Sequence, residues 1–178
     1  MKLLLENWRR YLTEIGEATA KSYPFELLDQ STADDMRRVR YSFKSENYLY
    51  HVDFRSFLGG GKESSTWIIN FEAKPDASGK FSKGMTGEGR PLQIMSTVVK
   101  IIKDFVGNPQ LNEGILHFRF TGMSKSGGVD LYTGKETQRT RLYRAFLDKH
   151  LPETEITEVG TNVIAFTVPE EQKDETPT

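Results

Sequence analysis

The chain has 178 residues, with 24 Lys and Arg against 25 Asp and Glu, and a formal net charge of -1. This length is typical of one domain with a sizeable hydrophobic core, and the balanced charge argues against binding to nucleic acid or an anionic membrane through overall charge. The chain has no cysteine and three histidines, which excludes disulfides and thiolate catalysis and argues against a zinc site, so we expect no metal.

The first residues predict an amphipathic helix. Four apolar side chains recur at spacings of three and four and form one stripe: Leu5, Trp8, Leu12 and Ile15. Gly16 ends the pattern. The apolar run at residues 3–5 stops at Glu6, so it is shorter than the ~7–15 residues of a signal peptide core or the ~20 of a membrane span. We therefore expect a protein of the cytoplasm with no membrane partner.

Alternating apolar residues then predict a series of strands. They cover residues 23–30, 36–45, 48–55 and 66–73, with a turn at residues 45–47 that makes a hairpin. The second strand carries a basic face with Arg38, Arg40 and Lys44, which fits either phosphate groups or solvent.

The second half alternates helices with strands. Residues 94–105 predict a helix, residues 114–122 a strand, and residues 136–151 a second helix that Pro152 ends. Residues 154–159 and 162–168 predict a closing hairpin. The acidic, Pro-containing residues 169–178 are typical of a disordered tail. The order favours an α+β (α/β sandwich) fold with a mixed sheet over residues 17–168, after a separate segment at residues 1–16.

The same order resembles the fold of the GNAT acetyltransferases, in which a meander of strands leads through a glycine-containing turn into a central helix, a strand, a second helix and closing strands. The resemblance covers roughly residues 1–168 and becomes specific at two positions. It implies an N-acyltransferase that uses acetyl-coenzyme A.

The first specific position is the turn Gly87-Glu88-Gly89-Arg90, where the family binds the cofactor pyrophosphate. Amides at a helix start attract phosphate, and glycine lets it approach them. The turn has Gly84 where the family has Gln or Arg, and Pro91 removes one amide donor. The alternative is a loop that only starts the helix.

The second specific position is Tyr143, which lies where a family tyrosine protonates the departing thiolate of coenzyme A. Glu136 and Arg139 stand where the family has Asn and Ala. The alternative is a tyrosine that packs at the edge of the core.

A base for the acceptor amine is expected on the strands, where His51, Asp53 and Glu72 are candidates. His51 and Asp53 are two residues apart, so they lie on the same sheet face. Such residues also serve as ordinary polar side chains of a half-exposed strand.

The first 14 residues, "MKLLLENWRRYLTE", resemble the leaders that target internal proteins of tailed bacteriophages to the assembling head, where a protease cuts after the glutamate of a Leu/Ile-x-Glu site. Leu12-Thr13-Glu14 fits that site. Later segments resemble uncharacterised phage proteins of this fold.

Two functions follow from these resemblances. The favoured one is a non-catalytic phage protein, placed inside the virion or in the host cytoplasm, with a head protein or a host protein as partner. The alternative is a coenzyme A-dependent N-acyltransferase. The sequence leaves the oligomeric state open.

Overall fold

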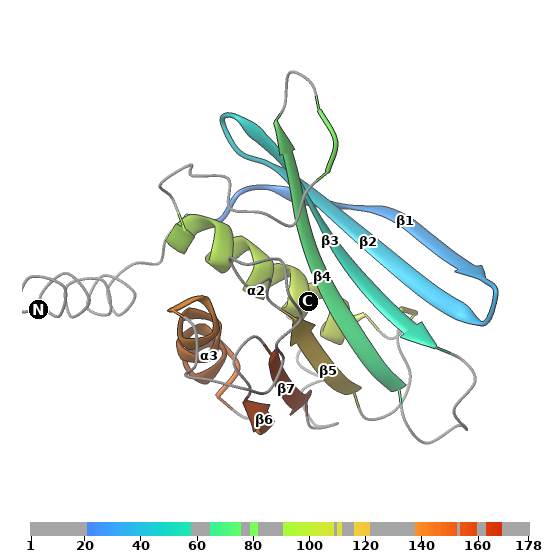
Figure 1. Ribbon diagram of the computed structural model, residues 1–178, viewed down its shortest axis with the longest axis vertical. Helices are drawn as coiled ribbons and strands as arrows, with labels where there is room; N and C mark the ends of the chain where they lie inside the picture. The colour runs from blue at the N-terminus through green and yellow to red at the C-terminus, as the bar shows by residue number, and fades with distance from the viewer. Residues whose placement is uncertain are drawn as a thin grey trace, which may run out of the picture.

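The computed structural model shows a seven-stranded mixed sheet and two helices among the residues that it describes (Figure 1). The strands are β1 (Phe25–Ala33), β2 (Met36–Lys44), β3 (Tyr48–Phe57), β4 (Ser65–Pro75), β5 (Leu116–Thr121), β6 (Glu155–Val159) and β7 (Val163–Val168). The helices are α2 (Pro91–Gly107) and α3 (Gln138–His150). The described residues are 21–57, 65–75, 79–81, 91–108, 110–111, 116–121, 138–152, 154–159 and 163–168.

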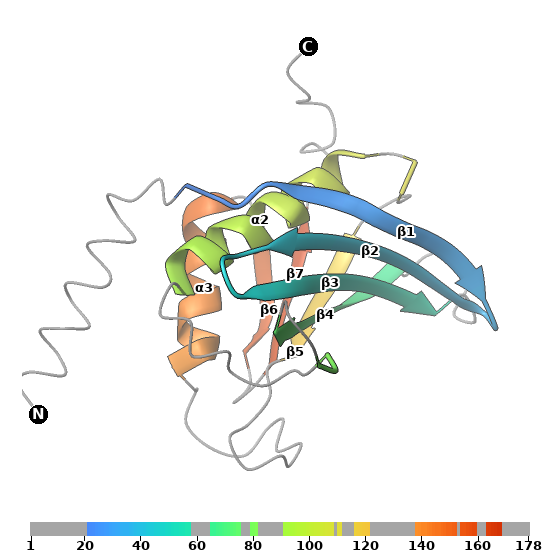
Figure 2. The ribbon, with the colours of Figure 1, turned by 90° about the horizontal axis from the view of Figure 1, so that it is seen from above.

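The sheet order is β1-β2-β3-β4-β5-β7-β6. Neighbours are antiparallel except β4 and β5, which are parallel and enclose α2 between them in the sequence. β1, β2 and β3 form long, curved neighbours in Figure 2. The predicted α+β class, mixed sheet and both hairpins are confirmed.

β1 runs three residues beyond the predicted strand, because a tight turn joins it directly to β2. Asp34 and Asp35 occupy the turn with φ of 48° and 58°. Positive φ at both central residues suits the twist of a two-residue hairpin, and Asp tolerates this conformation better than most residues.

The core is built around an aromatic cluster between the sheet and α2. Phe105 of α2 is fully buried and stacks on Phe54 with ring centroids 4.1 Å apart. Trp67 and Phe118 meet the Phe105 ring edge-on at 4.9 and 6.0 Å. The cluster ties α2 to three neighbouring strands, and it includes side chains that the alternating pattern predicts to be buried.

Both described helices cover the same face of the sheet. α2 packs on Phe54 and Phe118, while α3 places Tyr143 against Phe120, which lies on the same face of β5 as Phe118. α2 and α3 also contact each other. We call the opposite face of β1 to β4 the open face, since neither described helix covers it. It carries the polar side chains of β2 and β3.

Candidate functional site

The described residues include some of the predicted site residues and leave out others. The turn from Gly87 to Arg90 lies outside them, as do residues 1–16 and the tail at 169–178. The roles expected for those segments therefore stay predictions. Tyr143, His51 and Asp53 are described. Tyr143 packs on the helix-covered face of the sheet, whereas His51 and Asp53 lie on the open face.

β4 and β5 are parallel neighbours that pair over only part of β4. Their register ends at Ile69 opposite Phe120, and β5 stops one residue later. Residues 71–75 continue past β5 while they remain paired with β3. The two strands therefore part at the carboxyl end of β4, from which the chain leads on to α2. The first turn of α2 carries no acidic residue, so no carboxylate there opposes an anion at the helix start.

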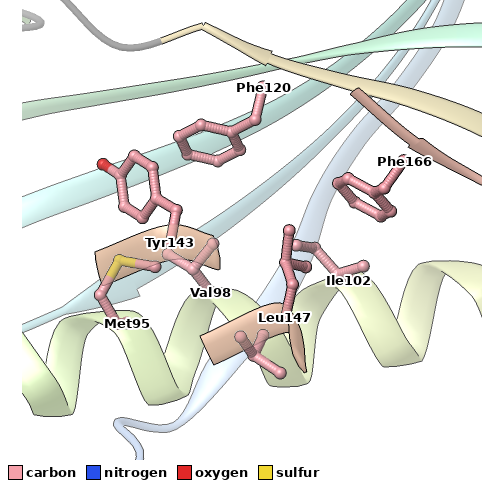
Figure 3. Close-up of a pocket in the computed structure, with 8 residues that line it drawn as sticks. Met95, Val98, Ile102, Phe120, Tyr143, Leu147 and Phe166 are labelled. Atoms are coloured by element: carbon pink, nitrogen blue, oxygen red, sulfur yellow. The ribbon is translucent and has the colours of Figure 1, made fainter. Parts of the chain in front are cut away.

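Tyr143 lies on the helix-covered face near this parting. Its side chain is 8% exposed, and its ring meets Phe120 edge-on with centroids 4.3 Å apart. In Figure 3 its hydroxyl points away from Leu147 and Phe166 and away from the α2 ribbon. Tyr143 thus combines a buried ring, fixed against Phe120, with a hydroxyl on the side of the ring away from α2.

A small apolar cavity lies beside Tyr143, between α2, α3 and strands β5 and β7 (Figure 3). Its volume is about 10 Å³, at the lower limit of the space that one water occupies. Its lining is Met95, Val98, Val99, Ile102, Phe120, Tyr143, Leu147 and Phe166. The cavity is a gap in packing and is too small for a substrate.

Asp53 lies on the open face and is 1% exposed. Arg40 donates to both of its oxygens, at 2.5 Å from Nε and 2.8 Å from Nη2. Arg55 donates a further hydrogen bond to Oδ2 at 2.9 Å. Burial alone raises the pKa of the Asp53 carboxyl, but the hydrogen bonds from the two arginines outweigh it, so the pKa is lowered. A carboxylate with a lowered pKa is a weak base, and this arrangement favours a structural role.

His51 lies two residues away on the same face, as predicted, and it is 7% exposed. Its ring stacks on the Phe81 ring with the two centroids 3.9 Å apart. The Lys74 ammonium also lies over the Phe81 ring, 5.1 Å from its centroid. Burial lowers the pKa of His51, and the nearby Arg40 charge lowers it further. Its Nδ1 is buried and makes no hydrogen bond within the described part of the chain. The lowered pKa thus favours the neutral form of His51, whose ring is stacked on Phe81.

The partners of Asp53 and His51 could not be assigned from the sequence alone. Arg40 reaches Asp53 because the register places it opposite Asp53, and Arg55 reaches Asp53 because it lies two residues further along the same strand and on the same face. Glu72 lies opposite His51, and its carboxylate is 3.7 Å from Arg40. Charge alternation on adjacent predicted strands was the available signal, but the strand register was needed to read it.

Within the described residues, no group of three or more His, Asp or Glu side chains could hold a metal ion. Neither α2 nor α3 is long and apolar enough to cross a membrane. No protein-family model, curated protein or solved structure matches the chain.

Proposed function

We propose that this chain binds the coenzyme A part of an acyl donor where β4 and β5 part, and that it acts as an N-acyltransferase of the GNAT type. The observation that carries the proposal is the register of the parallel pair, which ends at Ile69 and Phe120 while β4 continues. The strand and helix order from β2 to β7 also agrees with the order that the resemblance implies.

The parting of the strands suits an extended ligand that contains amides. Residues 71–75 of β4 continue past the part that pairs with β5, and the edge of a strand is where an extended ligand with amide groups can add to a sheet. The start of α2 attracts an anion through its helix dipole, and its first turn places no carboxylate against one. These two features together fit a molecule with a diphosphate at one end and an amide-containing chain.

The bound thioester would supply an activated acyl group. The acceptor amine would attack the thioester carbonyl, the carbon–sulfur bond would break, and Tyr143, whose ring is fixed against Phe120, would protonate the departing sulfur. The proton that the amine loses would pass to solvent, from which the tyrosine is reprotonated. Asp53 does not act as the base in this proposal, since Arg40 and Arg55 donate hydrogen bonds to its oxygens.

The test is thermal unfolding of the full chain with acetyl-coenzyme A, with ATP at equal ionic strength as the control for a general polyphosphate effect. A ligand at about 100 times its dissociation constant adds about 2.7 kcal/mol of stability. For a domain of this size the melting temperature then rises by roughly 5–10 °C. No rise at millimolar acetyl-coenzyme A, or an equal rise with ATP, contradicts the proposal.

The Tyr143→Phe variant separates binding from catalysis. We expect it to keep the melting-temperature rise, since the ring and its contact with Phe120 remain, and to lose most acyl transfer to amine acceptors. Equal turnover by the variant and the wild type would show that the hydroxyl is not the acid.

A second candidate function is non-catalytic binding of a phage or host protein through the open face. The favouring observation is that Arg40 and Arg55 hold Asp53 in a rigid network, next to the 63% exposed side chain of Phe57 on the same face. We expect a partner bound by the wild type to be lost by Phe57→Ser and kept by Leu28→Ser, which changes an exposed leucine on β1. Equal retention by both variants would exclude this face.

A further inference from the structure

The arginine pair of the open face, Arg38 and Arg55, brings two cationic side chains side by side on neighbouring strands. The two residues are directly opposite each other on β2 and β3, an arrangement that is unfavourable for like charges. Arg38 is held by Asp29 at 2.6 Å, while Arg55 shares Asp53 with Arg40. Asp53 therefore serves two guanidinium groups. Arg40 also has the Glu72 carboxylate at 3.7 Å, so among the described residues Arg55 depends on the shared carboxylate alone.

The guanidinium groups of the arginine pair are also partly exposed and have donors without a hydrogen bond in the described part of the chain. About a third of each side chain is exposed, 32% for Arg38 and 36% for Arg55. The Nε atoms of both are buried and make no hydrogen bond to any described residue. A further carboxylate is the chemistry that suits the exposed part of this pair, because a guanidinium binds a carboxylate through paired donors.

We propose that the chain's own acidic tail, residues 169–178, docks on the arginine pair. The tail has four carboxylates against one lysine, a net of -3. It lies outside the described residues, and it begins directly after Val168 at the end of β7. Charge complementarity and the attachment point together favour this occupant over a separate molecule.

The tail is long enough to reach. Val168 pairs with Leu116 of β5, which in turn pairs with Ser65 of β4. The β4 residue opposite Arg55 is Ile68, which lies three residues beyond Ser65. Three strand spacings across the sheet and three residues along it amount to about 17 Å. Asp174 is six residues beyond Val168, which spans up to about 20 Å when extended. Asp174 and Glu175 are therefore the first carboxylates that reach Arg55.

Tethering makes a weak contact sufficient. A short flexible connection gives an effective concentration in the millimolar range, so that ion pairs too weak to hold a free peptide become populated. Because the contact lies at the surface, salt at several tenths molar should release it.

The experiment uses the absence of cysteine from the chain. A spin label on Thr176→Cys in the full chain broadens the amide signals of nearby residues. We expect broadening at residues 36–38 and 55–57 in low salt, and its loss in the Arg38→Gln/Arg55→Gln double variant and at high salt. Arg144→Gln, which removes an exposed arginine of α3, is the matched control and should leave the broadening unchanged.

Three results would overturn the proposal. They are broadening that survives in the double variant, broadening spread evenly over the sheet, and broadening seen only when labelled and isotope-enriched chains are mixed, which would indicate a second copy. Should the double variant fail to fold, Asp174→Asn/Glu175→Gln removes the same contact from the tail side. Unchanged broadening in that variant also refutes the docking.

Discussion

Asp53→Asn tests whether the Arg40–Asp53–Arg55 network holds the meander together. The substitution keeps the size of the side chain and removes its charge. Asp53 is 1% exposed and accepts from both arginines, so the variant leaves two cations without their shared carboxylate. We expect the free energy of unfolding to fall.

The size of the loss follows from the exposure of each partner. Removing one member of a buried ion pair costs about 3–5 kcal/mol. Arg40 and Arg55 are 21% and 36% exposed, so both regain some hydration, and the asparagine still offers one acceptor oxygen. We therefore expect a loss of about 2–3 kcal/mol, which lowers the melting temperature by roughly 5–10 °C.

Urea denaturation at pH 7 measures the loss, and its pH dependence gives a second check. The pKa of Asp53 is lowered in the folded state, so its contribution is present above the unfolded value of about 3.9 and disappears as pH falls toward the folded value. The difference between wild type and variant should thus be full at pH 7 and shrink below about pH 4.

Asp29→Asn is the matched control. It makes the same chemical change in the more exposed pair with Arg38, where the side chains are 40% and 32% exposed. We expect a loss below about 1 kcal/mol. Equal losses at Asp29 and Asp53, or an Asp53→Asn loss within about 0.5 kcal/mol of zero, would refute a structural network.

Three further predictions concern other parts of the chain. Because the pKa of His51 is lowered on folding, its contribution to stability is present above the unfolded value of about 6.5 and is lost as pH falls. His51→Gln should therefore flatten the decline in the free energy of unfolding between about pH 7.5 and 5.5. Identical pH slopes for the wild type and the variant contradict this. Phe105→Ala should cost about 3–5 kcal/mol in urea denaturation, against under about 0.5 kcal/mol for the exposed Phe57→Ala, and similar losses would place the core elsewhere. If the leader resemblance holds, mass spectrometry of virions should find a chain that begins at Ile15 after cleavage at Glu14, whereas the intact chain alone would exclude head processing.

The fold could be predicted in large part because its signals are local. Alternation on β2, β3 and β4 and the helical spacing of α2 each arise within one element. Val39, Tyr41 and Phe43 are buried as their alternation indicates, and the turn between β2 and β3 falls at residues 45–47. The end of β1 was missed because Asp34-Asp35 carries a weaker hairpin signal than Asn-Gly or Asp-Gly.

The candidate site depended on register, which a single sequence does not give. His51 and Asp53 share a face as expected, yet both are buried, not half-exposed. His51 contacts Phe81, and Asp53 contacts arginines on two strands, and these groups meet only once the strands are aligned. The parting of β4 and β5 is likewise a property of two segments far apart in the chain.

The consecutive order of β1 to β4 has a consequence for how the chain acquires its structure. Each of these strands pairs with the next one along the sequence, whereas β5 joins β4 only after the long excursion through α2. Short-range pairing loses less chain entropy before contacts form, so we expect the meander to assemble ahead of β5 and β7. Pulsed hydrogen exchange during refolding would show protection first in β2 and β3, and simultaneous protection of β7 would argue for a single concerted step.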